Sequence, residues 1–136
     1  MTKAALSSAD YVTLADFRHA LRQFLAFSEG KAAEEGLTAQ QHQALLAIRA
    51  AQPDKATIGY IAERLILKPH SASGLVDRLE TLGLLIRRSS TTDRRQALLD
   101  LTDKADAILA KLSATHREEI RRLRPLLVDL LHRADE

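Results

Sequence analysis

The chain has no cysteine, no tryptophan, and only three prolines and five glycines among its 136 residues. Without a thiol it can form no disulfide bond, no cysteine-ligated zinc site and no thiolate redox sensor. It also lacks an apolar run near the roughly 20 residues that a membrane-spanning helix needs. Its first residues lack the apolar core of a secretory signal. We therefore expect a soluble, cytoplasmic protein without a membrane segment.

Charge of either sign is nearly balanced, with a formal net charge of +2 and a pI near 9.2. The distribution of charge along the chain is therefore more informative than its sum. Residues 63–95 hold seven bases and four acids, an excess of three where the whole chain has an excess of two. Such a stretch is either an ordinary solvated surface or a surface that binds nucleic acid.

Apolar residues are 46% of the chain, and their spacing predicts helices first. From Tyr11 to Leu25 they recur every three or four positions, which predicts one long amphipathic helix over about residues 8–35. Gly36 suits its C-terminal cap. Thr38 and Gln41 have the spacing of a capping box, which predicts a second helix to about residue 51. A third, short helix is expected after Thr57, whose hydroxyl can cap it.

The next segment predicts a helix followed by a hairpin. Pro69 suits the first position of a helix, and Gly83 would end it. Residues 84–88 and 96–101 predict two short strands joined by a polar tip. The inward face of the helix would carry Ala72, Leu75, Val76 and Leu79.

A fifth helix is expected from Asp103, with Thr102 as its cap. Its apolar pattern continues to Leu131. Pro125 lacks the N–H for a helical hydrogen bond, so it must either start a sixth helix or kink one long helix. The pattern does not decide between the two.

These elements predict a mainly α fold with a small β-wing, in a single domain over residues 1–136. A winged helix-turn-helix would span about residues 37–102, between long helices at about 8–35 and 103–136. Because so short a chain has little core for these helices to cover, we expect them to pair two subunits in a homodimer. The alternative is a helical layer within one chain.

Several motifs follow one another in a recognisable order. They are LTAQQHQALLAI at 37–48, ERL at 63–65, LVDRLETLGLL at 75–85, IRR at 86–88, DRR at 93–95 and LDLT at 99–102. The motifs and their order resemble the MarR family of bacterial winged-helix regulators. The resemblance implies a homodimeric transcription regulator, more often a repressor than an activator, that binds a pseudo-palindromic DNA operator with one recognition helix per half-site. It also implies that Arg94 enters a minor groove and that Asp93 holds the wing in shape.

The start of the helix after Pro69 is expected to contact base edges and phosphates, because hydroxyls and helix N-terminal amides can bind both. In the wing, a narrow minor groove attracts a guanidinium, and Asp93 could fix the Arg94 side chain through a bidentate pair. The candidate DNA-binding residues are Lys68, Pro69, His70, Ser71, Ser73, Arg78, Arg94 and Arg95.

Three of these candidates have an alternative role. Arg95 either braces the wing or touches DNA. Arg78 either clamps a phosphate or pairs with Asp77 or Asp93. His70 either reads a purine or only faces solvent.

Three positions depart from the family pattern. Ile66 stands where many relatives carry glycine in the turn between the two helices, so a branched residue must accept that backbone or the turn must differ. Lys68 occupies a position where a capping serine or threonine is common. Ala105 replaces a frequent glycine.

Many members of the family release DNA when a small aromatic or phenolic anion binds between the dimerisation helices and the winged domain. The alternative is that the phenylalanines are ordinary packing residues. His19 lies off their apolar stripe. The residues that the resemblance places around such an effector are Phe17, Phe24, Phe27 and His42.

No cofactor and no metal site are expected. The five histidines form no HxxxH or HxxH pair, and a lone histidine seldom binds metal; a composite zinc site from separate helices is the alternative. The sequence therefore predicts a DNA-binding regulator with a small-molecule effector, or alternatively an architectural DNA-binding protein without one. An enzyme is not expected, because the chain carries no nucleophile elbow, phosphate loop, HExxH or dinucleotide motif.

Overall fold

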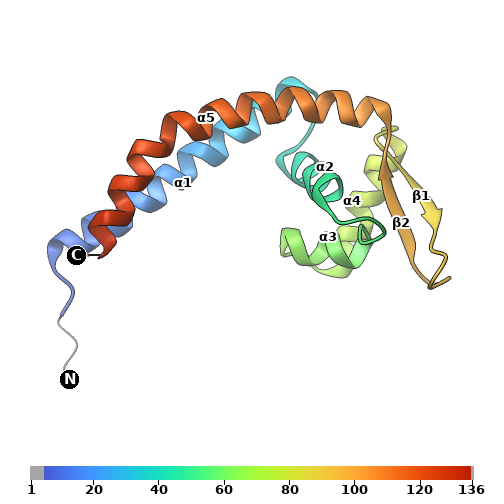
Figure 1. Cartoon of the computed structure of the whole chain (residues 1–136), viewed down its shortest axis with the longest axis horizontal. Helices are drawn as coiled ribbons and strands as arrows, with labels where there is room; N and C mark the ends of the chain where they lie inside the picture. The colour runs from blue at the N-terminus through green and yellow to red at the C-terminus, as the bar shows by residue number, and fades with distance from the viewer. Residues whose placement is uncertain (1–4, 136) are drawn as a thin grey trace.

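The predicted hairpin is present, and helices precede it and follow it in the sequence. The computed structural model describes residues 5–135. Within them the expected fold class, mainly α with a small β-wing, is confirmed (Figure 1). The elements are α1 (Ser8–Glu34), α2 (Ala39–Ala50), α3 (Ile58–Leu65), α4 (Pro69–Thr81), β1 (Leu85–Ser89), β2 (Ala97–Leu101) and α5 (Asp103–Asp135).

Local signals in the sequence set the helix boundaries. Thr38 and Gln41 form a full capping box at the start of α2, and the Thr57 hydroxyl accepts the Tyr60 N–H at the start of α3. Gly36 follows α1 with a φ of 77°, where the Gly36 N–H donates to Ala33 and the next N–H donates to Ala32. This is the left-handed closure that glycine allows without a steric penalty.

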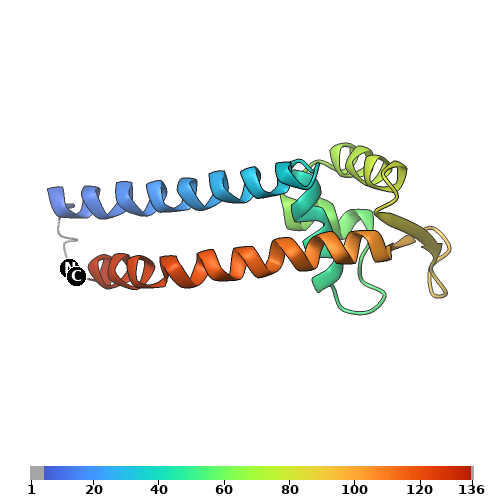
Figure 2. The same cartoon turned by 90° about the horizontal axis from the view of Figure 1, so that it is seen from above.

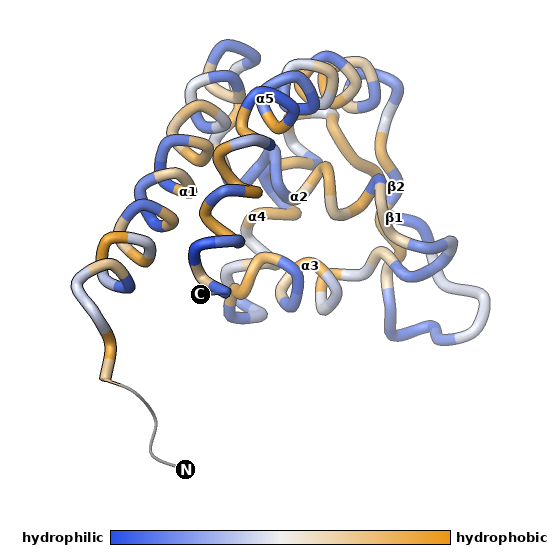
Figure 3. The backbone as a smooth tube through the Cα atoms, turned by 60° about the vertical axis from the view of Figure 1, so that its left-hand side comes forward, coloured by the Kyte–Doolittle hydropathy of each residue, from blue (hydrophilic) through white to orange (hydrophobic). Residues whose placement is uncertain are grey.

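The core lies where α2, α3, α4 and the base of the hairpin meet. The predicted inward face of α4 is buried throughout. In Figure 3 the hairpin tip is hydrophilic, whereas the strand residues near α5 are largely hydrophobic. The fully buried large side chains of this region are Leu45, Ile61, Val76, Leu79, Leu84 and Leu85.

The terminal helices α1 and α5 run side by side (Figures 1 and 2). They extend away from α2, α3, α4 and the hairpin, which together are called the winged domain below. Helix α5 is one continuous element of 33 residues with Pro125 inside it, so no sixth helix begins there. Figure 1 shows α5 curved along its length. No helix within residues 5–135 combines the length and apolar character that crossing a bilayer requires.

The hairpin is antiparallel, with Leu85 opposite Leu101 and Ser89 opposite Ala97. One further backbone hydrogen bond joins it to the segment between α2 and α3, where the Leu99 N–H donates to the Ala56 carbonyl at 2.9 Å. The hairpin base is thereby held against the loop that precedes α3.

Candidate nucleic-acid interface

A tight turn joins α3 to α4 and sets the direction in which α4 leaves the core. Ile66 occupies this turn in the left-handed region, with φ 55° and ψ 51°. The following N–H, of Leu67, donates to Ala62 at 2.8 Å and closes α3. The branched residue thus accepts the backbone that glycine adopts in many relatives. Its side chain is 92% exposed, so no packing of that side chain offsets the strain.

The start of α4 is open to an external ligand. Lys68 is the N-cap but makes no side-chain capping hydrogen bond, and Pro69 takes the first helical position. The first N–H groups of α4 therefore lack a side-chain acceptor and are available to an anion such as a phosphate. Of the candidates here, Ser73 is half-buried, and the exposed ones are Lys68, Pro69, His70 and Ser71.

Arg78 lies further along the exposed side of α4. The adjacent Asp77 pairs with Arg87 of β1. Within residues 5–135 Arg78 forms no ion pair with Asp77 or Asp93. Its Nη2 instead reaches back over Gly74, 3.9 Å from where a Cβ would stand. Of the two alternatives for Arg78, the intrachain pair with Asp77 or Asp93 is therefore not formed among residues 5–135.

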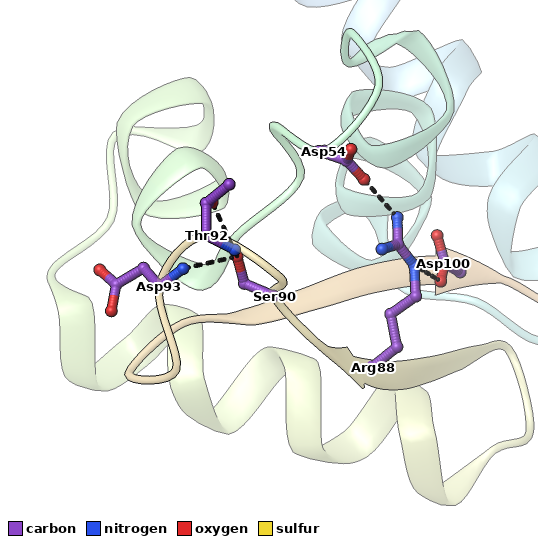
Figure 4. Close-up of polar contacts among 6 residues, drawn as sticks. All are labelled: Asp54, Arg88, Ser90, Thr92, Asp93 and Asp100. Carbon is purple, nitrogen blue, oxygen red and sulfur yellow. Dashed lines mark hydrogen bonds and ion pairs between the residues drawn. The ribbon is translucent and has the colours of Figure 1, made fainter.

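The wing tip is held by short polar contacts around Ser90 and Asp93 (Figure 4). The buried Ser90 hydroxyl accepts the N–H groups of Thr92 at 3.3 Å and of Asp93 at 3.1 Å. The Asp93 carboxylate accepts the backbone N–H of Arg95 at 2.9 Å. The expected bidentate pair between Asp93 and Arg94 is not formed, because this carboxylate bonds to the backbone of the tip and not to a guanidinium.

The four arginines of the hairpin fall into two groups. Arg87 pairs with Asp77 and with Glu80 of α4, and Arg88 pairs with Asp54 and Asp100, both at 2.7 Å. Arg94 and Arg95 are exposed and make no ion pair with any carboxylate in the described part of the chain. The hairpin base thus uses its guanidinium groups internally, while the tip presents two of them outward.

The candidate effector residues converge only in part. Phe24 and Phe27 of α1 contact His116 of α5 edge-on, with their ring centroids 6.0 and 5.6 Å from that of His116. The ring centroid of His42 of α2 lies 4.9 Å from that of His116. Phe17 is 38% exposed and lies outside this cluster. The structure therefore brings three of the four candidates together around a residue that the sequence analysis did not name.

His116 could have been found from the spacing of its helix. Leu109, Leu112 and His116 follow one another at steps of three and four, and all three are buried. The His116 Nδ1 lies 2.6 Å from the Leu112 carbonyl oxygen, which can only accept, so Nδ1 carries the proton. The Ser28 hydroxyl oxygen lies 2.8 Å from Nε2, within hydrogen-bond distance.

His42 is a buried polar group with an unused nitrogen. It is 3% exposed, and its Nδ1 has no hydrogen-bond partner among the described residues. Burial, and secondly the neighbouring His116, hold the pKa of His42 below its usual value. Near it, Phe27 and Lys31 border an open cavity of about 680 Å³ between α1 and α5. Within residues 5–135 no three histidine, aspartate or glutamate side chains gather as metal ligands would.

A helix-turn-helix whose second helix leads directly into a two-stranded antiparallel hairpin defines a winged helix-turn-helix protein. The sequence model of the MarR family matches residues 35–96, from the end of α1 through the wing tip. Over this part of the chain, the match confirms the resemblance to the MarR family that the motifs carry.

Three proteins are similar to this chain. The HTH-type transcriptional regulator MhqR of Bacillus subtilis (strain 168) is 37% identical over 60 residues, which is 44% of this chain and 41% of MhqR. The HTH-type transcriptional regulator MgrA of Staphylococcus aureus is 29% identical over 86 residues, which is 56% of this chain and 58% of MgrA. The chain therefore matches about half the length of these relatives. The crystal structure of an S. aureus MepR-DNA complex shares the fold, with a TM-score of 0.67, 22% identity, and coverage of 88% of this chain and 82% of that one.

Proposed function

We propose that this protein is a cytoplasmic transcription regulator that binds double-stranded DNA sequence-specifically. The observation that carries the proposal is the division of the hairpin arginines. Arg87 and Arg88 are used within the fold, whereas Arg94 and Arg95 at the tip are exposed and free of acidic partners in the described chain. An exposed arginine at the tip of a hairpin would be attracted by the enhanced negative potential of a narrow minor groove.

In this proposal the start of α4 enters the major groove beside the wing. Ser71 and Ser73 would donate to base edges or phosphates, His70 would face a base, and Lys68 would meet a phosphate. Pro69 would shape the helix start, and Arg78, which forms no ion pair with any residue from 5 to 135, would clamp a phosphate. Asp93 supports the wing by bonding to the Arg95 backbone.

We propose that two copies bind a pseudo-palindromic operator as a homodimer through α1 and α5. Most exposed large apolar side chains of the described chain lie on these two helices, which is unusual for a monomer surface. One winged unit reads one half-site, so pairing would supply the second. The exposed apolar residues on α1 and α5 are Tyr11, Val12, Leu14, Phe17, Leu21, Leu25, Ile120, Leu126, Val128 and Leu131.

We further propose that the protein is a repressor released by a small aromatic anion. The cluster of Phe24, Phe27 and His42 joins α1 and α2, so a ligand there would touch both the proposed dimerisation layer and the winged domain. Phe17 would contribute only from the exposed side of α1. Lys31 at the nearby cavity would offer a positive charge to the anion.

The test is selection of bound fragments from the source genome, followed by competition footprinting at physiological salt. The proposal expects a short protected palindrome and an affinity at least about a thousandfold above that for unrelated DNA. Binding without sequence preference would favour an architectural DNA-binding protein. Compounds related to neighbouring genes, added to the selected complex, would then test release.

A further inference from the structure

The base of the wing is bridged to the loop between α2 and α3 by one side chain. Arg88 of β1 donates from Nε to Asp100 of β2 and from Nη2 to Asp54 of the loop, each at 2.7 Å (Figure 4). The two carboxylates bond to different nitrogen atoms of one planar guanidinium, and both hydrogen bonds are charge-assisted. The bridge therefore joins both strands of the wing to a segment 34 residues earlier in the chain.

The neighbouring arginine holds the opposite side of the same strand. Successive side chains of a strand point to opposite faces, and Arg87 accordingly reaches Asp77 and Glu80 of α4. The wing base is thus held on one face by the recognition helix and on the other by the α2–α3 loop. Every residue from 91 to 96, beyond this base, is exposed.

Asp54 is positioned for this contact by an uncommon backbone. Its φ is 63°, in the left-handed region that asparagine and aspartate tolerate better than most residues. Two residues later, the Ala56 carbonyl accepts the Leu99 N–H of β2. The loop is therefore bonded to the wing by one backbone hydrogen bond and one ion pair, and of these two the ion pair is the one that reaches β1.

We propose that Asp54 and Arg88 are positioning residues that set the angle of the wing, and thereby the reach of Arg94 into DNA. This inference rests on the proposed DNA-binding function. If Asp54 positions the wing, its loss should weaken DNA binding. If Asp54 acts only through its charge, its loss should tighten binding, because DNA is a polyanion. The sign of the change in affinity therefore distinguishes positioning from charge.

The test is binding of a selected DNA fragment by the full-length protein carrying Asp54→Asn. Asparagine keeps the size of the side chain and its tolerance of a positive φ, so the change removes mainly the charge. We expect binding about tenfold weaker, with the thermal unfolding midpoint shifted by only a few degrees, since exposed ion pairs contribute little stability. The matched control is Asp106→Asn, which removes an exposed carboxylate of α5 that lies 3.9 Å from Arg49 and should leave binding equal or slightly tighter.

A double-mutant cycle with Arg94→Ala adds a readout that a purely structural role would not move. Alone, Arg94→Ala should weaken binding by about 5- to 150-fold. In the Asp54→Asn background its effect should shrink to a few-fold, because a misplaced wing has already lost that contact. Arg88→Lys, which preserves net charge but replaces the fixed Nε and Nη2 donors with a single ammonium nitrogen, should reproduce both results.

The outcomes separate this inference from the proposed function. If Arg94→Ala does not weaken binding, the wing contact itself is absent and the proposed function fails. If Arg94→Ala weakens binding but Asp54→Asn does not, or if the two effects are independent, the positioning role is overturned. Unfolding of both Asp54→Asn and Arg88→Lys would also overturn it, since the bridge would then serve stability alone.

Discussion

Ile66 bears the clearest local strain in the chain. A β-branched side chain at a φ of 55° crowds its own backbone, at about 1–2 kcal/mol relative to an ordinary conformation. Its side chain is almost wholly in solvent, so packing of that side chain does not offset the strain. Asp54 shares the positive φ, but its short polar side chain suits that region better.

At this scale we predict that Ile66→Gly stabilises the protein. Relief of the strain outweighs the extra freedom that glycine gives the unfolded chain, so the free energy of unfolding should rise by about 0.5–1 kcal/mol. Urea denaturation would measure it. The control is Ile86→Gly, an exposed β1 position, where glycine should lower stability by a similar amount. A loss of stability in Ile66→Gly would contradict the strain argument.

We predict that Arg94→Ala weakens DNA binding by about 1–3 kcal/mol without dissociating the proposed dimer. The wing arginine would lose its minor-groove contact, while α1 and α5 lie elsewhere in the fold. A gel-shift titration and sedimentation velocity would measure the two properties. Arg117→Ala, which removes an exposed arginine from α5, serves as the control and should bind nearly as the parent does. Equal affinity of both variants would exclude Arg94 from the interface.

Among the elements, the junction of α1, α2 and α5 carries a pH-sensitive group. Protonation of His42 is disfavoured in the folded state by burial and by His116, so its folded pKa lies below the ordinary 6.5. The unfolded chain therefore binds more protons as the pH falls through about 6.5. The stabilisation is fully present above that pH and is lost progressively below it.

We accordingly predict that the urea midpoint falls between pH 7.5 and pH 5.5, and that His42→Leu removes part of this fall. Leucine keeps an apolar side chain in the buried site and cannot titrate. The control His19→Leu changes an exposed histidine of α1 and should leave the pH dependence unchanged. Identical pH profiles for the parent and His42→Leu would rule out the assigned role of burial.

The elements were largely predictable from the sequence because their signals are local. Thr38, Gln41 and Thr57 cap helices over three residues, and Gly36 closes α1 within one turn. Local signals did not decide whether Pro125 starts a sixth helix or lies within one long helix. Whether a proline ends or bends a helix depends on the packing of the residues beyond it, and here Leu130 is buried on the continued α5.

The contacts that place the site were not predictable, because they join distant positions. Nothing near Asp54 indicates Arg88, and nothing near Ser28 indicates His116, which is 88 residues away. The Asp93–Arg94 pair was expected from adjacency, but the competing backbone N–H of Arg95 takes the carboxylate. The role of a charged side chain in a turn depends on which donor the backbone presents to it.

For the whole molecule, we predict that deleting the residues after Arg124 abolishes dimer formation. The deletion removes the buried Leu130 and the Arg133 guanidinium, which lies 3.4 Å from Asp16 of α1. Part of the apolar side of α1 would then lose its cover, and the proposed dimer surface would lose Leu126, Val128 and Leu131. Sedimentation equilibrium would measure the subunit mass, with circular dichroism to follow the fold. A folded dimer of the shortened chain would place the interface elsewhere.

The pairing of α1 with α5 also governs the order in which the chain can fold. The Arg133–Asp16 contact spans 117 positions and the His116–Ser28 contact spans 88, whereas the hairpin and the α3–α4 turn close over short loops. Closing the long loop becomes less costly once the winged domain has shortened it by folding. The winged domain is therefore expected to form first. The apolar faces of α1 and α5 then stay exposed until the two helices pack against each other or against the same helices of a second chain.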